Sequence, residues 1–466
     1  MVATDVVGNC LPGAVERYYH QPLWLGWLFL LGVTLVTAVP YYTAFAASYW
    51  LLARRFRAAL PLLAGAAWTA AELGRVKLLG GNPWGVAGYS QVGFMPVMQI
   101  AAVTGVYGMS FLVVSVNAAI AQAWVALFEP GSSRREAVIG SLATAAVLAL
   151  SLAYGGSRLG AANAATEPIR PVELAIIQGN LDLGSQWRSE MYGRNLDEYL
   201  RLTNEAMRAR APALVFWPES ALTFFIDSEP AYQAAIGRIL SARDVQLVTG
   251  GPRMEGSADA PRYFNSTFVV SPEGKPLAWY DKQHLLPFAE YFPLRSLDLL
   301  RRRFERVRQF TPGSVAEPLP TIAGRAGVIV CNEAMFPEPA RERVSAGADY
   351  LVNPANDSWF GDLKFSTQVF DIVRLRAVEE HRYLVRTSTA GPSAIIDPSG
   401  HVIARTEPFT RAWIAGPIAP DRSSTAYHRI GDLFAYFCAL VTLGACALAA
   451  TSIGREHGPR QERDSP

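Results

Sequence analysis

The sequence is short of charge, and its few charges nearly cancel. Only 18% of the 466 residues are charged, whereas an ordinary soluble domain carries about 25%. With 42 basic and 40 acidic side chains, the net charge of +2 lacks the basic excess of a nucleic-acid-binding face, which argues against a nucleic-acid partner. A glycine period and a heptad run are also missing, and 11% of the residues are aromatic, which together exclude collagen, coiled coil and disorder.

Cysteine is scarce as well. Four cysteines do not make a disulfide framework in a chain of this length. Cys10 lies near the N-terminus, and Cys438 and Cys446 lie in an apolar run near the C-terminus, so Cys331 is the single cysteine of the long polar middle. No cluster of residues has the spacing of metal ligands, and neither a metal nor another cofactor is expected.

Long apolar runs are present at both ends of the chain. A membrane-spanning helix needs about 20 apolar residues, which predicts four or five N-terminal helices and one C-terminal helix. The first two runs are separated only by Pro40 and form either one long helix or two helices hinged there. The predicted domains are a membrane bundle over residues 1–157, a catalytic domain over 158–430, and a C-terminal transmembrane helix with a cytoplasmic tail over 431–466. The apolar runs are residues 23–39, 41–52, 60–79, 94–128, 137–154 and 433–452.

Basic residues predict the orientation of these helices. Cytoplasmic loops carry an excess of lysine and arginine, so three arginine clusters are assigned to the cytoplasm. The middle of the chain then lies outside the bacterial inner membrane, on the periplasmic side, although Arg75 and Lys77 oppose this scheme. The clusters are Arg54, Arg55 and Arg57; Arg134 and Arg135; and Arg455, Arg460 and Arg463.

Polar residues also stand within the apolar part. Such residues usually face the interior of a bundle, where they shape a lipid-accessible site or serve helix packing alone. A plain anchor is the simpler alternative, but anchoring needs only one helix. The residues are Glu72, Asn82, Gln91, Gln99 and Asn117.

From residue 172 the pattern predicts an α/β domain. Short apolar runs that end in turn residues are typical of buried strands, and the stretches between them have helical spacing. Turns at residues 272–274 and 398–400 are expected to join antiparallel strands. The expected strands are residues 172–180, 213–220, 245–251, 265–274, 326–334, 350–357, 382–388 and 393–400, and the expected helices are 191–209, 230–243, 336–345 and 365–381.

Three reactive side chains follow strand-like runs. Glu219 ends VFWPES, where partial desolvation raises a carboxyl pKa and suits a general base, although an acid near a helix N-terminus is the simpler interpretation. Lys282, in YDKQHLLPFAEYFP, could stabilise an oxyanion or simply lie at the surface. Cys331 ends GVIVC before NEAMFPE, where a helix N-terminus would lower the thiol pKa of a nucleophile, although buried cysteines are often structural. His284 is a weaker candidate base.

The ordered set of glutamate, lysine and cysteine resembles the nitrilase superfamily of carbon–nitrogen hydrolases. The longer strings WPES, YDKQHLLPFAEYFP, CNEAMFPE and NDSWFG resemble its apolipoprotein N-acyltransferase branch, as do QGNLDLGSQW and AELGRVKLLGGNPWGVAGYSQ. The resemblance runs from about Leu60 to the last helix. It implies a nitrilase-like α-β-β-α sandwich domain flanked by N-terminal transmembrane helices and one C-terminal transmembrane helix.

The resemblance also implies a mechanism. It makes Cys331 the nucleophile, Glu219 the general base and Lys282 the stabiliser of the tetrahedral intermediate, with Glu290 and Glu333 in support. Trp187 matches an aromatic residue on a loop over the lipid-facing mouth and is assigned to substrate binding. A phospholipid would donate an acyl chain to Cys331 as a thioester, and a diacylglyceryl-cysteine lipoprotein would accept it on its α-amine.

Four departures from the family pattern bear on the acceptor. The N-terminal membrane part is shorter than usual, Asn332 replaces a usual tyrosine, Thr389 replaces a usual asparagine, and Pro392 follows the glycine. The alternatives are therefore a conjugal-transfer paralogue of the same branch with another acceptor or none, a membrane-bound amidase, and a non-catalytic envelope component. A complete triad argues against the last, because an unused thiol outside the cytoplasm is easily oxidised.

Overall fold

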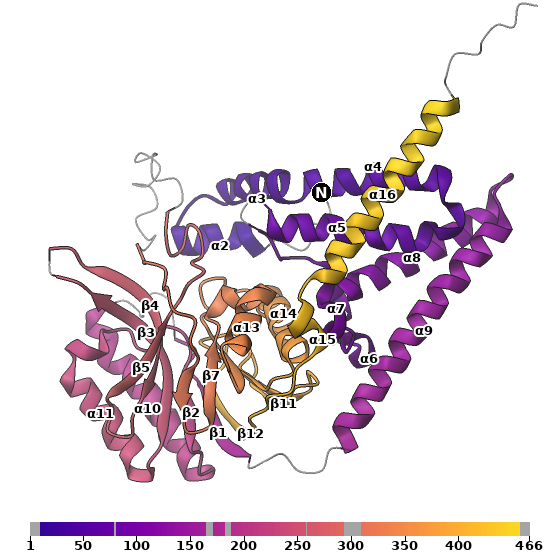
Figure 1. Cartoon of the computed structure of the whole chain (residues 1–466). Coiled ribbons are helices and arrows are strands. Elements are labelled where there is room, and N and C mark those ends of the chain that lie inside the picture. Colours follow the sequence, from indigo (N-terminus) through magenta and orange to yellow (C-terminus); the bar gives the residue numbers. More distant parts are fainter. Residues whose placement is uncertain are drawn as a thin grey trace, which may run out of the picture. The chain divides into compact units, whose positions relative to one another are not determined.

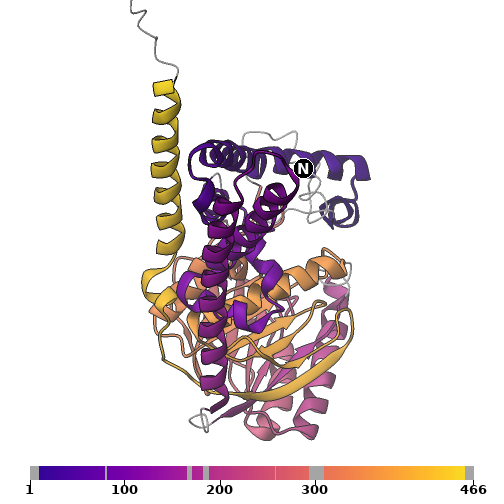
Figure 2. The same cartoon turned by 90° about the vertical axis from the view of Figure 1, so that its right-hand side faces the viewer.

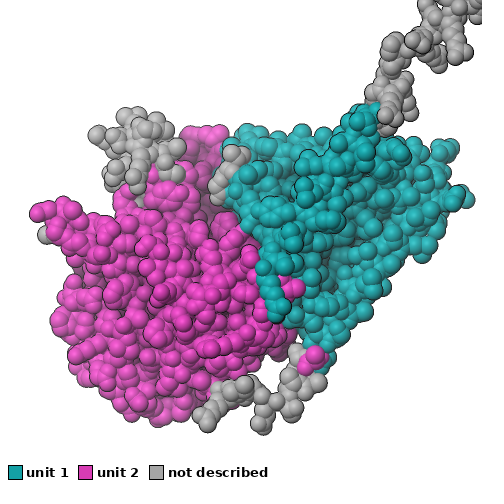
Figure 3. Space-filling model, viewed as in Figure 1, with its two compact units in different colours: residues 1–5, 31–160, 429–466 teal, residues 6–30, 161–428 magenta. Residues whose placement is uncertain are grey.

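The computed structural model describes residues 10–78, 81–164, 171–181, 188–257, 259–292 and 309–456. The chain forms two compact units, which Figure 3 shows in different colours. The first, the helical unit, comprises residues 1–5, 31–160 and 429–466. The second, the catalytic unit, comprises residues 6–30 and 161–428, so three segments of the chain form the helical unit and two form the catalytic unit.

Among the described residues of the helical unit, three helices are individually long and apolar enough to cross a membrane, at Val106–Phe128, Arg134–Ala161 and Leu433–Thr451. The helices α3 and α4 pass the same test as a pair bent by 42°, with Pro40 in the first turn of α4, so the two-helix alternative for the first run is correct. Figure 2 shows α16 as one straight helix. The helices are α3 (Leu23–Thr37), α4 (Val39–Arg55), η1 (Arg57–Ala59), α5 (Leu60–Lys77), η2 (Ala87–Gln91), α6 (Met95–Met98), α7 (Ala101–Thr104), α8 (Val106–Phe128), α9 (Arg134–Ala164), α15 (Ala426–Ile430) and α16 (Leu433–Glu456).

Two apolar runs differ from the sequence prediction. The run 94–128 forms three helices, α6, α7 and α8, and α7 and α8 are separated at Gly105, which has a φ of +62°. The helix α5 packs against α4, α8 and α16, yet it is not among the apolar candidates, since it carries Glu72, Arg75 and Lys77. The number of N-terminal spans therefore stays a prediction.

Some polar residues of the helical unit do face its interior. Glu72 is fully buried and accepts hydrogen bonds from Trp68 Nε1 at 2.8 Å and from the amide of Ala87 at 2.7 Å. Gln99 is also buried, whereas Asn117 is exposed and donates to the carbonyl of Val113 in its own helix. Glu72 thus connects α5 to the first residue of η2.

In its described residues, the catalytic unit is an α-β-β-α sandwich of two six-stranded sheets. Their strand orders are β12-β1-β2-β3-β4-β5 and β11-β10-β9-β8-β7-β6. Each sheet has a parallel centre, β1-β2-β3 or β7-β8-β9, with antiparallel strands on both sides. The strands are β1 (Val172–Gln178), β2 (Leu214–Phe216), β3 (Gln246–Glu255), β4 (Arg262–Val270), β5 (Pro276–Asp281), β6 (Leu319–Thr321), β7 (Gly324–Val328), β8 (Tyr350–Ala355), β9 (Leu384–Ser388), β10 (Ala394–Ile396), β11 (Val402–Arg405) and β12 (Ala412–Ile418).

Both faces of each sheet are covered, which explains the continuous apolar runs. In β1, Leu174 and Ile176 pack between the sheets, while Ala175 and Ile177 pack under the helices. Figure 1 shows α10 and α11 at the outer side of the first sheet, and α13 and α14 pack against the second. These helices are α10 (Tyr192–Ala209), α11 (Pro230–Leu240), α13 (Pro337–Ser345) and α14 (Leu363–Glu380), and the short ones are η3 (Ser189–Met191), η4 (Ile226–Ser228), η5 (Ser241–Arg243) and η6 (Cys331–Met335).

Both predicted turns join antiparallel strands, β4 to β5 and β10 to β11. One helix was not expected in this unit. The helix α2 (Cys10–Tyr19) and the start of α3 group with the sandwich, whereas the sequence prediction placed the first 157 residues together. The catalytic unit therefore includes a segment that precedes the first apolar helix.

Candidate active site

Glu219 lies three residues beyond β2, in a turn held on several sides. Its side chain is buried, and Asn265 Nδ2 donates to its Oε1 at 2.7 Å. The next residue, Ser220, has a φ of +58°, a strained conformation for a residue with a side chain. Thr389 Oγ1 donates to the main-chain carbonyl of Glu219 at 3.2 Å. Burial raises the pKa of the Glu219 carboxyl, against the opposing effect of Lys282, as the sequence predicts for a general base.

Lys282 follows β5 directly and is almost completely buried between two carboxylates. Its Nζ lies 2.8 Å from Glu290 Oε2 and 3.8 Å from Glu219 Oε1. Burial alone would lower the pKa of Lys282, but the carboxylates of Glu290 and Glu219 outweigh it and raise this pKa. Lys282 is therefore a permanent cation in the site.

Asn265 connects the two carboxylates. Its Nδ2 donates to Glu219 Oε1 and to Glu290 Oε1, each at 2.7 Å. Its main-chain carbonyl accepts from the amide of Lys282 at 2.9 Å. One residue of β4 thus fixes three charged groups. Sequence reasoning did not single it out, because a lone asparagine within a strand carries no local signal.

Cys331 opens η6 with a φ of +50°, so the nucleophile turn, residues 329–333, is strained at its centre. Cys331 as a whole is half-buried, and its thiol is a hydrogen-bond partner of Glu219. Burial and the Glu219 carboxylate raise the pKa of the thiol well above its ordinary value, with Lys282 opposing. The expected lowering of the pKa by a helix N-terminus is therefore wrong: η6 is a single 3-10 turn of five residues, and a carboxylate faces the sulfur.

Glu333 joins the nucleophile turn to the segment after β5. It is fully buried, and its Oε1 accepts from Tyr280 OH at 2.9 Å and from the amides of Gln283 and His284 at 2.8 and 3.0 Å. Its Oε2 accepts from the amide of Val330 at 2.6 Å. Burial opposes ionisation, yet the hydrogen bonds from His284 outweigh it and lower the pKa of Glu333. Glu333 is thus ionised, and its hydrogen bonds connect the nucleophile turn with the segment that follows β5.

His284 pairs with Glu333 rather than with the thiol. Its Nδ1 lies 3.8 Å from Glu333 Oε1, and half of its side chain is exposed. The hydrogen bond to Glu333 raises the pKa of His284. Its neighbour across the turn is Asn332, whose Nδ2 donates to the carbonyl of His284 at 3.1 Å.

A buried polar cluster supports the nucleophile turn from the second sheet. Asn353 Nδ2 donates to the carbonyls of Ile329 and Cys331 at 2.6 and 3.3 Å. The buried Arg386 donates to Asn353 Oδ1 and pairs with Asp357 Oδ2 at 2.7 Å. This cluster also escaped sequence reasoning, since its members lie in β8, in β9 and in the loop after β8.

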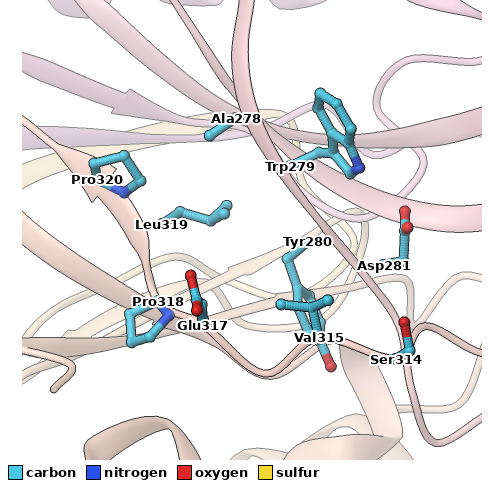
Figure 4. A pocket seen from close by; sticks show the side chains of 10 residues that line it. All are labelled: Ala278, Trp279, Tyr280, Asp281, Ser314, Val315, Glu317, Pro318, Leu319 and Pro320. Atoms are coloured by element: carbon cyan, nitrogen blue, oxygen red, sulfur yellow. The ribbon is translucent and has the colours of Figure 1, made fainter. Parts of the chain in front are cut away.

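One predicted substrate-binding residue, Trp187, lies outside the described residues. Within the ranges given above, no three metal-binding side chains come together. A separate cavity of about 270 Å³ is lined by residues 278–281 of β5 and by residues 314, 315 and 317–320 (Figure 4). Its lining contains none of Glu219, Lys282 and Cys331. Tyr280 connects the two regions, because its ring lines the cavity and its hydroxyl donates to Glu333.

The arrangement places a carboxylate base, a fixed cation and a thiol together in one buried cluster. Glu219 can take the proton of Cys331, which converts a weak nucleophile into a thiolate. Lys282 can then stabilise the oxyanion that forms when the thiolate attacks a carbonyl carbon. These groups suit acyl transfer through a covalent intermediate.

Comparison with known proteins agrees with this geometry. Residues 173–426 match the carbon-nitrogen hydrolase family, and residues 12–119 match the N-terminal domain of apolipoprotein N-acyltransferase. The apolipoprotein N-acyltransferase of Geobacter metallireducens is 35% identical over 392 residues, which cover 84% of this chain and 73% of that protein. The enzyme of the same name from Pseudomonas aeruginosa strain PAO1 is 31% identical over 461 residues, which cover 97% and 85% of the two chains.

Among solved structures, a carbon-nitrogen hydrolase from Helicobacter pylori G27 is similar with a TM-score of 0.43 and 19% identity. The similarity covers 57% of this chain and 94% of that one.

Proposed function

The chain belongs to the apolipoprotein N-acyltransferase family, and from that premise we propose that it moves a fatty acyl chain from a phospholipid, through a thioester on Cys331, to the α-amine of a diacylglyceryl-cysteine lipoprotein. It is an acyltransferase with apolar helices that fit a membrane. The observation that supports this mechanism best is the buried contact of Glu219 with both Lys282 and Cys331.

In the first half-reaction, Glu219 takes the proton of the Cys331 thiol, and the sulfur attacks an ester carbonyl of the phospholipid. The oxyanion of the tetrahedral intermediate develops beside Lys282. Collapse breaks the bond between the carbonyl carbon and the glycerol oxygen, and the proton held by Glu219 passes to that oxygen. The products are a lysophospholipid and an acyl thioester, with Glu219 ionised again.

In the second half-reaction, the ammonium of the lipoprotein cysteine loses a proton to Glu219, and the amine attacks the thioester carbonyl. The carbon–sulfur bond breaks, and an amide forms. The amine loses two protons in total, of which one returns to the Cys331 sulfur and the other leaves to solvent. Glu219 thus acts as base in both halves, and Lys282 keeps its charge throughout.

The setting of the reaction is part of the proposal. The proposed donor is a membrane phospholipid, and the proposed acceptor is a lipoprotein that carries a diacylglyceryl group, in accordance with the family's name. The arginine clusters favour a multi-pass protein of the bacterial inner membrane with the catalytic unit on the periplasmic side.

The mechanism is tested by the intact mass of the purified protein after incubation with phospholipid vesicles, before and after neutral hydroxylamine. We expect a fatty-acyl adduct that hydroxylamine removes and that Cys331→Ala does not form. The variant should still insert into membranes. A mass that stays unchanged, under conditions that label an established acyltransferase, would contradict the mechanism. Free fatty acid released without lipoprotein modification would instead support the hydrolytic alternative.

A further inference from the structure

Two loops support opposite sides of the candidate active site. The Glu290 loop, residues 284–292, carries the carboxylate that holds Lys282. The Asp357 loop, residues 356–362, carries the partner of Arg386 beneath the nucleophile turn. Both lie outside the named strands and helices, and the Glu290 loop has a single isolated bridge, between Pro287 and Tyr291.

The helix α2 and the start of α3 contact the Glu290 loop at Phe288. Tyr19 OH donates to the carbonyl of Phe288 at 2.5 Å, and the ring of Phe29 lies edge-on to the Phe288 ring at 5.7 Å. Phe288 has a φ of +65°, a conformation that persists only where neighbouring contacts impose it. Two residues further on, Glu290 Oε2 accepts a hydrogen bond from the amide of Leu286. The same oxygen pairs with Lys282.

The same helix contacts the Asp357 loop through the two residues that directly precede Tyr19. The guanidinium of Arg17 donates to the carbonyl of Phe360, and the ring of Tyr18 lies against Trp359 at 5.8 Å. From this loop the contacts continue inward through Asp357 and Arg386, as described above, to Asn353 and the carbonyl of Cys331. One ten-residue helix therefore touches both loops, and each loop leads to a different member of the triad.

We propose that α2 is a positioning element of the active site. Tyr19, acting through Phe288, keeps Glu290 on Lys282, and Arg17, acting through Phe360, keeps Asp357 beneath the nucleophile turn. The inference rests on the proposed function for its effect on acyl transfer. A displacement of about 1 Å in an active site can cost about 100-fold in rate, so small losses of loop register are measurable. A helix that merely tethers the first apolar helix would instead affect insertion and stability.

The experiment compares Tyr19→Phe with the parent protein in detergent. The substitution keeps the ring and removes the hydroxyl that donates to Phe288. We expect thioester formation to slow by about tenfold, with the KM for phospholipid and the melting temperature unchanged. We also expect alkylation of Cys331 by iodoacetamide to slow at least about threefold, because a loosened Lys282 stabilises the thiolate less well. Peptide mass spectrometry separates Cys331 from the other three cysteines.

Tyr436→Phe is the matched control, because this tyrosine is exposed on α16 in the other unit, and both rates should stay at the parent level. Arg17→Met is the second test variant and should slow both reactions through the Asp357 loop. Parent-like alkylation in Tyr19→Phe and in Arg17→Met would overturn the role of α2. Alkylation does not depend on lipid, so a parent protein that is alkylated but never acylated would contradict the proposed function and leave the α2 result independent of it.

Discussion

Asn265 holds the two carboxylates of the site in one arrangement, and its contribution can be measured as a pH effect. Its hydrogen bond lowers the pKa of Glu219, against the burial that raises it. Because Glu219 must be ionised to take the proton of Cys331, thioester formation falls as the pH drops through the pKa of Glu219. Because burial raises the pKa of Glu219 more than its hydrogen bonds and Lys282 lower it, the midpoint of this fall should lie above the ordinary pKa of 4.5.

Asn265→Ala removes the donor and should therefore raise the pKa of Glu219 further, which moves the acid midpoint of thioester formation to higher pH. The measurement is the rate of hydroxylamine-labile acylation across a pH series. Asn117→Ala, an exposed change on α8, is the control and should leave the profile in place. A midpoint that moves to lower pH would show that Asn265 does not stabilise the ionised carboxylate.

At the scale of single residues, the sequence predicts the reactive side chains better than the residues that hold them in place. Glu219, Lys282 and Cys331 stand just beyond apolar strand-like runs, and that local pattern is visible in one dimension. Asn265 and Asn353 act on residues 46 and 22 positions away, so only the folded chain reveals their targets. Thr389 was noted only as a departure from the family pattern, and the structure gives it a bond to the Glu219 carbonyl.

Gly250 of β3 shows how an element positions the base. A Cβ at this residue would lie 2.6 Å from the Cα of Glu219 and 2.8 Å from the carbonyl oxygen of Pro218, both of them backbone atoms that cannot turn aside. The strand can therefore approach the Glu219 turn only because residue 250 has no side chain.

Gly250→Ala should destabilise the catalytic unit by about 1–3 kcal/mol, the usual cost of overpacking, and should slow thioester formation because Glu219 is displaced. Thermal unfolding in detergent and the acylation rate report the two effects. Gly193→Ala in α10 is the control, because its nearest neighbour would be a tyrosine hydroxyl at an ordinary 3.7 Å. Equal stability and activity in both variants would show that the backbone around Glu219 can shift to accommodate a Cβ at residue 250 without measurable cost.

Elements with strong local patterns are predictable, and those that depend on tertiary partners are not. The eight strands expected from apolar runs are all present, since both faces of each sheet are buried. Four strands, β5, β6, β11 and β12, were missed, because they lie at the sheet edges and have exposed positions in their burial patterns. The grouping of α2 with the sandwich also escaped prediction, since its partners lie hundreds of residues later.

For the whole molecule, the arginine clusters predict the side of the membrane on which each part lies. A reporter fused after residue 455 should be active in the cytoplasm, and one inserted after Ser257 should be active only outside the inner membrane. Paired alkaline phosphatase and fluorescent protein fusions read the two sides. The reverse pattern would overturn the topology, and cytoplasmic signals at both positions would contradict the assignment of α16 as a span.

Because each unit combines segments that are distant in the sequence, contacting parts of one unit are synthesised at different times. Arg17 and its partner Phe360 are 343 residues apart, and ribosomes add about 5–20 residues per second. The helix α2 therefore waits about 20 to 70 seconds before the second of its two loops has been made. Throughout that interval the nascent chain has an amphipathic helix without its docking surface, so closing the catalytic unit around α2 is among the last steps of biogenesis.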